Sequence, residues 1–240
     1  MRVVWLRGLA LVGILSLLGC ADAEKRVGRL PAENGCLVLA TTLGSPPYAY
    51  CDKATGEIRG IDIDFARAAA KKLGRKLEVR PMLFSLLLPS VKAGTADFAA
   101  AAITITPARA RDVDFTEPYA YDGSAFLYRT GETRPTAALG NAIRIGTQET
   151  SSSQFFLSDH GIDSISYPEF DDALADFEKG LLDAVFYDAE PIRVVVAKSS
   201  GAYSMTPLFT RENYGLAVRK DFPELLAALN EIIRSRKSAK

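Results

Sequence analysis

Two oppositely charged side chains stand just beyond apolar segments, where they could bind a charged ligand. Arg109 comes four residues after the apolar run 98–105, and Asp188 directly follows the apolar run 184–187. The planar guanidinium of an arginine suits two parallel hydrogen bonds to a carboxylate, and an aspartate accepts charge-assisted hydrogen bonds from an amine. The chain therefore offers one partner for a carboxylate and one for an ammonium group.

Each of these residues also has a simpler explanation. Arg109 could be a surface arginine like its neighbour Arg111, because arginine side chains are mostly exposed. Asp188 could cap a helix that starts at residues 189–191, because aspartate before a first turn that contains proline is a common helix start. The residues alone leave both alternatives open.

The elements that must position Arg109 and Asp188 alternate between strand and helix. In the first half we expect strands at residues 36–41, 77–80 and 98–105, a hairpin after Pro46-Pro47, and helices at 61–73 and 86–92. The pattern restarts after Tyr121. There we expect strands at 124–129, 142–146, 165–167, 184–187 and 214–218, and helices at 154–158, 170–179 and 223–234. This alternation predicts an α/β fold with parallel strands.

The N-terminus is typical of an export signal. Arg2 and Arg7 flank the start of an apolar run at residues 8–18, which is too short for a conventional membrane-spanning helix. The run ends in Leu-Leu-Gly before Cys20 and resembles a bacterial lipobox, which implies cleavage before Cys20 and lipidation of its sulfur. An ordinary signal peptide cleaved nearby is the alternative. We expect residues 1–19 to be the signal and the polar residues 20–34 to be a tether.

Composition and charge limit the partners of the mature chain. Its 221 residues, out of 240, contain no later apolar stretch of about 18 residues, which a membrane helix needs. Without Arg2 and Arg7 the side chains carry 27 positive and 29 negative groups. This balance provides no basic excess for a phosphate backbone, so we expect no nucleic-acid partner.

Two cysteines remain if Cys20 carries a lipid. Cys36 and Cys51 form a single possible pair, and an oxidising compartment favours joining them. A bridge requires Cα atoms within about 7 Å of each other. Two cysteines 15 residues apart without a nearby histidine do not form a zinc site, and we expect neither a metal nor a cofactor.

Four sequence blocks resemble the family 3 extracellular solute-binding proteins, the polar amino-acid-binding subunits of ATP-binding-cassette importers. The first block is SPPYAY followed by GEIRGIDIDFARAAAKKLG, and the second is FSLLLPSVKAGTADFAAAAITITPARARDVDFTEPY. The others are the turn IGTQETSS and the strand end DAVFYD. One such motif is weak evidence, but four in the correct order and spacing are strong. The resemblance covers nearly all of residues 36–233.

The resemblance implies a periplasmic-binding-protein fold of type II, in which two α/β lobes are joined by two crossover strands and the ligand lies in the cleft. We expect residues 35–121 and 212–240 to form the first lobe and residues 122–211 to form the second. Ligand sites in clefts at the carboxyl ends of strands also follow from general α/β geometry. We expect a monomer on the outer side of a bacterial membrane, anchored there by its lipid and in contact with the importer's permease subunits.

The same resemblance assigns roles to individual residues. Arg109 matches the arginine that binds the ligand's carboxylate, and Asp188 matches the aspartate that binds its ammonium group. Further matches are the hydroxyl residues Thr104, Ser151 and Ser152 of the carboxylate site, and Phe84 against the ligand's side chain. A serine before residues 154–158 could instead only cap that helix, and Phe84 could be ordinary core. A zwitterion that loses its water needs both an anionic and a cationic partner.

The chain departs from the family at positions that should determine specificity. Thr42 replaces a common aspartate, Ser45 a tyrosine, Ala102 a serine and Thr150 a glycine, while Gln148 lies near the expected side-chain region. Losing the aspartate removes a counter-charge, so we expect weak binding of lysine and arginine. The chain also ends at Lys240, before the additional C-terminal segment of most members, which affects packing on the first lobe.

Two other classes of protein remain possible. An enzyme of the cyclohexadienyl or arogenate dehydratase type would use the same fold, but it needs a positioned acid or base beyond the two ligand anchors. The single histidine, His160, lies in the turn-like sequence SDHGID and is expected to be a solvated loop residue. A ligand sensor without transport cannot be distinguished by sequence. We expect a binding protein rather than an enzyme.

Overall fold

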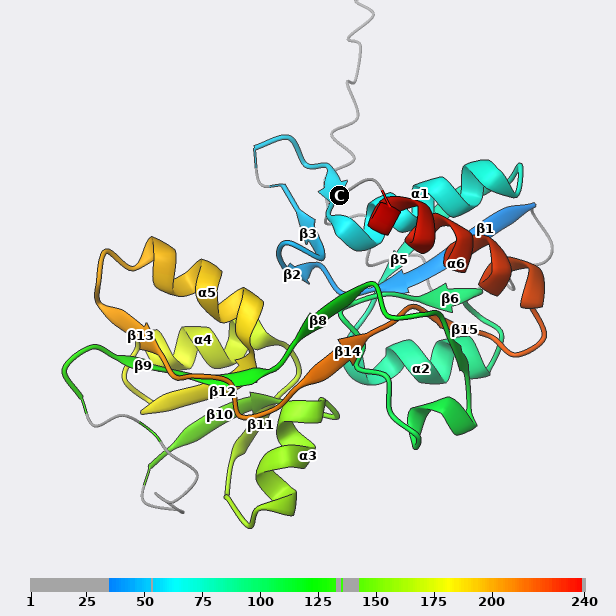
Figure 1. Cartoon of the computed structure of the whole chain (residues 1–240). Helices are drawn as coiled ribbons and strands as arrows, with labels where there is room; N and C mark the ends of the chain where they lie inside the picture. The colour runs from blue at the N-terminus through cyan, green and yellow to red at the C-terminus, as the bar shows by residue number, and fades with distance from the viewer. Residues whose placement is uncertain (1–34, 53, 133–134, 136–142, 239–240) are drawn as a thin grey trace, which may run out of the picture.

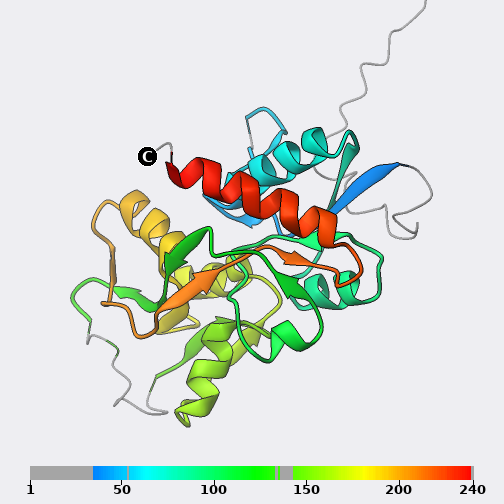
Figure 2. The same cartoon turned by 45° about the vertical axis from the view of Figure 1, so that its right-hand side comes forward.

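Two α/β lobes lie side by side and are connected by a pair of extended strands (Figures 1 and 2). The computed structural model describes residues 35–52, 54–132, 135 and 143–238. The predicted signal, tether and Cys20 lie outside the described residues. Within the described part of the chain, no helix is long and apolar enough to cross a membrane.

The first lobe contains a five-stranded mixed sheet between helices. In spatial order its strands are β5 (Lys76–Pro81), β1 (Cys36–Thr41), β6 (Phe98–Ala99), β15 (Ala217–Val218) and β7 (Asp114–Phe115). Side chains of β1 alternate between two cores. Leu37 and Leu39 pack with helices α1 (Ile61–Lys72) and α6 (Pro223–Ser238), and Val38 packs with α2 (Phe84–Lys92). Burial on both faces explains the unbroken apolar sequence of this strand.

The second lobe repeats this construction. Its strand order is β11 (Ile165–Tyr167), β10 (Ile145–Gln148), β12 (Ala184–Asp188), β9 (Ser124–Arg129) and β13 (Tyr203–Met205). All five residues of β12 are buried. Val185 packs with α4 (Phe170–Glu178) and α5 (Ala189–Lys198), and Phe186 packs on the other face with α3 (Ser152–Asp159). The central strand therefore ends with Asp188 at the edge of the sheet that faces the other lobe.

Two antiparallel strands carry the chain between the lobes. β8 (Ala120–Asp122) leaves the first lobe and β14 (Glu212–Tyr214) returns to it, with Glu212 opposite Asp122 (Figure 1). Gly123 follows β8, and a Cβ atom there would lie 2.1 Å from the carbonyl oxygen of Thr210. The close approach of the two connections therefore requires glycine at this position.

Most predicted elements are present, but three predictions need correction. Each five-stranded sheet contains antiparallel as well as parallel pairs, because the strands next to the crossover run opposite to the others. The predicted strand 98–105 is regular only in β6, after which Ala102 has a positive φ of 49°. The predicted strand 214–218 is divided between β14 and β15. Strand breaks at these points turn polar backbone and side chains toward the cleft. Ala142 lies outside the described residues.

The predicted Cys36–Cys51 bridge disagrees with the placement of the two cysteines. Cys36 pairs with Lys76, just after the C-terminal end of α1, whereas Cys51 in β3 (Ala49–Cys51) pairs with Ile58, just before its N-terminal end. A helix of 12 residues is about 18 Å long. The structure therefore does not join these two cysteines to each other, because a disulfide tolerates no such separation.

A buried carboxylate connects the first helix to the loop after β6. Asp62, in the first turn of α1, is fully buried and accepts a 3.4 Å hydrogen bond from the backbone N–H of Ala102. This bond supports Ala102 in its left-handed conformation, two residues before Thr104. Burial raises the pKa of Asp62 to about 6, because the charged form loses its water.

The raised pKa of Asp62 predicts a pH-dependent stability. Folding favours the neutral form of Asp62. The stability that this preference contributes is therefore fully present below the usual pKa of 3.8, and it is lost as the pH rises through about 6. The free energy of unfolding of Asp62→Asn, relative to the native chain, should rise by about 3 kcal/mol between pH 3.5 and pH 7. Urea unfolding at several pH values measures this difference. Asp64→Asn, at an exposed position of the same helix, is the control, and parallel pH curves for Asp62→Asn and the native chain would contradict the prediction.

Candidate functional site

The two predicted anchors face the cleft from opposite lobes. Arg109 begins a short 3-10 helix (Arg109–Arg111) of the first lobe, and its Nη1 donates to the carbonyl oxygen of Thr104 at 2.9 Å. Its Nη2 reaches the other lobe and donates to the carbonyl oxygen of Thr150 at 3.1 Å. The guanidinium also lies 5.6 Å from the centre of the Phe84 ring. These contacts hold Arg109 in the cleft, unlike the exposed Arg111.

Asp188 occupies the N-cap position of α5 but does not cap it. Its side chain accepts no capping hydrogen bond from that helix, so capping alone does not explain the residue. Burial raises the pKa of Asp188 well above its usual value, and the charges of Glu212 and Asp122 raise it further, while Arg109 opposes them. A cation beside Asp188 would offset this penalty.

Neither anchor forms an ion pair with a residue that the structure describes. Burial lowers the pKa of Arg109, while Asp188 and Glu212 act against this shift. An arginine has five N–H groups, and described residues engage two of them. The cleft thus holds a guanidinium with donors to spare and a carboxylate that lacks a cation. This arrangement can bind a molecule that carries both charges.

Glu212, which no sequence pattern singled out, lies at the centre of the cleft. Its carboxylate accepts hydrogen bonds from four hydroxyl groups contributed by both lobes and by the return connection. They are Thr104 at 2.5 Å, Ser152 at 2.7 Å, Thr210 at 2.7 Å and Ser124 at 2.9 Å. Glu212 is a single acid in the sequence TRENYG, and no repeating pattern around it indicates that it is buried or that it has these partners. Four donors supply the polar environment that a buried carboxylate requires.

The predicted carboxylate-site hydroxyls divide into two kinds. Thr104 and Ser152 approach each other across the cleft at 3.1 Å, and both donate to Glu212. Ser151 is the N-cap of α3, where its hydroxyl accepts from the backbone N–H of Gln154 and donates to the carbonyl oxygen of Gln148. Ser151 thus makes the capping contacts that were the alternative explanation. The hydroxyl hydrogens are used within the protein, which leaves Arg109 as the main donor to a ligand's carboxylate.

The residues predicted near the ligand's side chain form a second group. Tyr187 donates to Gln148 at 3.1 Å, and Gln148 donates to Glu169 at 3.0 Å. Ser45, from the first lobe, is buried and lies near enough to Tyr187 to counteract the rise in the pKa of its hydroxyl. The other predicted residues on this side of the first lobe, Thr42 and Ala102, are also buried. The structure therefore brings Ser45 and Gln148 together in one network, and it adds Glu169, which was not predicted.

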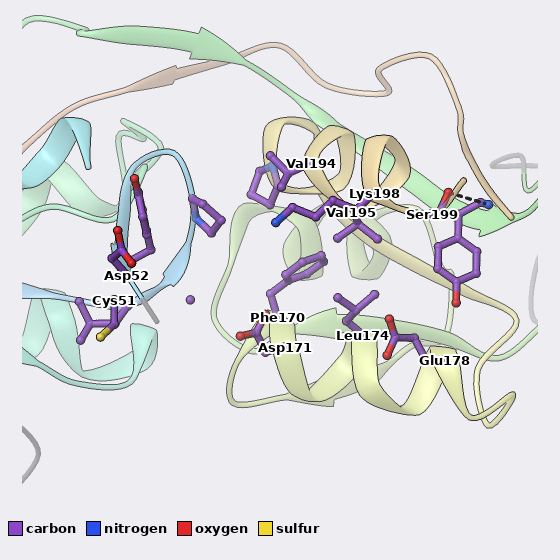
Figure 3. A pocket seen from close by; sticks show the side chains of 16 residues that line it. Cys51, Asp52, Phe170, Asp171, Leu174, Glu178, Val194, Val195, Lys198 and Ser199 are labelled. Atoms are coloured by element: carbon purple, nitrogen blue, oxygen red, sulfur yellow. Dashed lines mark hydrogen bonds between the residues drawn. The ribbon is translucent and has the colours of Figure 1, made fainter. Parts of the chain in front are cut away.

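A separate groove of about 710 Å³ opens between the lobes on another side (Figure 3). It lies between the hairpin around Tyr50 and helices α4 and α5, which contribute Leu174, Val195 and Lys198 (Figure 3). Phe170 lines it and stacks on Tyr187 with ring centres 4.4 Å apart. No residue predicted to bind ligand lines this groove, so it is distinct from the cleft with the two anchors.

Metal ligands and the single histidine were considered separately in the sequence, and the described residues place them as follows. These residues contain no group of three or more histidine, cysteine or acidic side chains that could hold a metal ion. His160 is exposed at the C-terminal end of α3, where its Nδ1 lies 2.7 Å from the carbonyl oxygen of Phe156. It is therefore a helix-end residue, at the opposite end of α3 from the capping Ser151.

Known proteins resemble this chain over most of its length. Residues 37–240 match the model of the bacterial extracellular solute-binding proteins, family 3. The ABC transporter arginine-binding protein 1 of Escherichia coli (strain K12) is 30% identical over 200 residues, which are 80% of this chain and 82% of that protein. The relatives therefore extend over both lobes and the connection between them.

Solved structures agree with the predicted fold. The arginine-bound form of truncated ArgBP from T. maritima superposes with a TM-score of 0.79 at 30% identity, covering 84% of this chain and 96% of that one. An ancestral amino-acid-binding protein, described as a precursor of cyclohexadienyl dehydratase, gives 0.76 at 27% identity over 85% and 90% of the two chains. The two-lobed type II fold is confirmed.

The hydroxyl cluster around Glu212 predicts a large effect of its removal. Glu212→Ala leaves four hydroxyls without their common acceptor and should lower the free energy of unfolding by about 2 kcal/mol or more. Glu212→Gln retains one acceptor oxygen and should lose less. Chemical denaturation of both variants measures this order. Glu224→Ala, at an exposed position of α6, is the control, and a Glu212→Ala variant as stable as that control would contradict the prediction.

Proposed function

The chain belongs to the bacterial extracellular solute-binding proteins of family 3, and we propose that it captures a free amino acid for an ABC importer. The observation that carries this proposal is the placement of Arg109 and Asp188. They are opposite charges from the two lobes, Asp188 buried and Arg109 partly buried, and neither has an ion partner among the described residues. An α-amino acid supplies the two missing charges on one carbon atom.

Each anchor has a specific task in this proposal. The remaining N–H groups of Arg109 bind the ligand's carboxylate, while its bonds to Thr104 and Thr150 fix the direction of the guanidinium. Asp188 accepts hydrogen bonds from the ligand's ammonium group, which lowers the cost of ionising a buried acid. Both contacts lose much of their strength if either lobe moves away.

The connecting strands would serve as the hinge for closure of the cleft. The proposed lobe boundaries, after Tyr121 and before Glu212, fall at β8 and β14. A ligand that binds residues of both lobes favours the closed arrangement over an open one, because only the closed arrangement has all its contacts. The closed form would then be the one that the permease subunits recognise.

The names of the relatives support the ligand class. The similar Escherichia coli protein is an arginine-binding protein of an ABC transporter, and other relatives bind cystine, histidine or glutamine by name. They share an α-amino acid and differ in its side chain. This pattern is consistent with anchors that bind only the α-carbon groups and with specificity that comes from other residues.

A binding screen tests the proposal. Among the twenty amino acids, at least one should stabilise the protein, by about 2.7 kcal/mol at 100 times its Kd. Arg109→Ala and Asp188→Asn should each abolish this stabilisation, because each leaves one buried ligand charge without a partner. Calorimetry and thermal unfolding measure both effects.

Arg111→Ala, at the exposed neighbour of Arg109, should bind normally. If no amino acid binds the native protein, the proposed function is wrong. If binding survives in a variant that folds normally, that residue does not belong to the site.

We also propose that Cys20 carries the lipid that holds the protein at the outer side of the membrane. Full-length protein produced in bacteria should fractionate with membranes, and its intact mass should include a diacylglyceryl group. Cys20→Ser should abolish the added diacylglyceryl mass, because the proposed lipid is attached to that sulfur. An unmodified mass for the native protein would contradict the proposal.

A further inference from the structure

Glu169 has an unusual use at the start of a helix. It occupies the N-cap position of α4, yet its side chain makes no capping hydrogen bond. Its carboxylate instead accepts from the Gln148 amide of its own lobe at 3.0 Å, and the backbone N–H of Phe84 of the other lobe lies near enough to counteract the rise in its pKa. Glu169 is therefore a side chain of the second lobe that reaches across the cleft.

The surroundings of Glu169 are the positions expected at the ligand's side chain. Gln148 also accepts from Tyr187 at 3.1 Å, and Phe84, whose backbone N–H influences the pKa of Glu169, places its ring 5.6 Å from the guanidinium of Arg109. Tyr187 directly precedes the anchor Asp188 in β12. A ligand held by Arg109 and Asp188 would thus extend its side chain toward Glu169.

The charge of this region is negative. Asp171 and Asp172 follow Glu169 in the first turn of α4, and Asp171 approaches Gly44 of the first lobe closely. Burial raises the pKa of Glu169 to about 7, and the charges of Asp172 and Asp171 add to the shift, against the bonds from Phe84 and Gln148. Glu169 has no ion pair with a described residue. Its carboxylate therefore lacks a cationic partner in the described part of the chain.

We propose that Glu169 selects the ligand's side chain, and that its carboxylate binds a cationic group at the far end of that side chain. The proposal rests on the proposed function, since it takes the α-carbon groups to be held by Arg109 and Asp188. It also reverses one expectation from the sequence. Thr42 removes a counter-charge from the first lobe, but Glu169 supplies one from the second, so amino acids such as arginine become favoured ligands.

Arginine and citrulline provide a matched pair of probes. They have nearly the same shape, but the guanidinium of arginine is charged and the urea group of citrulline is neutral. The native protein should bind arginine about tenfold or more tightly than citrulline, as expected when a hydrogen bond gains a full charge. In Glu169→Gln this ratio should fall to about threefold or less, because the amide retains shape but has no charge.

The control is Glu178→Gln, at the exposed end of the same helix. It should bind both probes as the native protein does. Equal binding of arginine and citrulline by the native protein would overturn the proposal. An unchanged ratio in Glu169→Gln would overturn it too, including when both affinities fall together, because Glu169 would then act only in closing the lobes.

A pH series gives an independent readout. The groups that face Glu169 are Asp171 and Asp172 of α4 and Tyr187 of β12, and burial raises the pKa of Tyr187 so that it stays neutral. Below about pH 7 Glu169 becomes protonated, so the preference for arginine should decrease from about pH 8 to about pH 6 in the native protein. Glu169→Gln should show a flat ratio, and a flat native ratio would contradict the assignment.

The outcomes separate this proposal from the proposed function. If no amino acid binds, including citrulline and arginine, the amino-acid site itself is wrong. If neutral amino acids bind through Arg109 and Asp188 but arginine has no advantage, the proposed function remains and the role of Glu169 is wrong.

Discussion

The carboxylate of Glu212 is the point at which both lobes and the return strand meet. A buried carboxylate requires donors, and here they come from Thr104 of the first lobe and from Ser124 and Ser152 of the second. These hydrogen bonds connect β14 to the loop after β6 and to the first turn of α3. These bonds help to hold the lobes in the arrangement of this structure, together with the bond from Arg109 to Thr150. The same bonds use the hydroxyl hydrogens that a ligand's carboxylate would otherwise receive, which gives Arg109 the larger part in anion binding.

The charge of the cleft supports the proposal that its ligand carries positive charge. Arg109 is attracted electrostatically to the carboxylates of Asp188 and Glu212, and Glu169 is a third carboxylate of this region. Hydroxyl donors compensate Glu212, but burial raises the pKa of both Asp188 and Glu169. In the proposed site, the ammonium group of the ligand would bind Asp188 and its cationic side chain would bind Glu169. Its carboxylate would accept hydrogen bonds from Arg109. In the proposed site this balance would favour a basic amino acid over an acidic one, even though Thr42 itself carries no charge.

Local sequence patterns predicted the elements whose residues are buried on both faces or on one helical stripe. The strand β1, the helix α1 and the strand β12 lie where the apolar patterns indicated, and Asp188 could be placed at a strand end for that reason. Glu212 and Glu169 were missed because their partners are distant in the chain, with a separation of 108 positions between Glu212 and Thr104. The Cys36–Cys51 pairing failed for a related cause. The two cysteines are only 15 positions apart, but the sequence does not reveal that they lie at opposite ends of helix α1.

Three helices of the second lobe begin beside the cleft, and their N-cap residues show how the site is made. Ser151 caps α3 with its own hydroxyl, whereas Asp188 and Glu169 occupy the N-cap positions of α5 and α4 without capping them. A helix N-terminus stabilises a negative charge and by itself would lower the pKa of a carboxylate there. Both carboxylates have raised pKa values instead, because burial removes their water and neighbouring acids repel them, Glu212 and Asp122 in the case of Asp188 and Asp172 and Asp171 in the case of Glu169. Neither side chain caps its own helix, and this is the arrangement that the proposed binding of ligand charges requires.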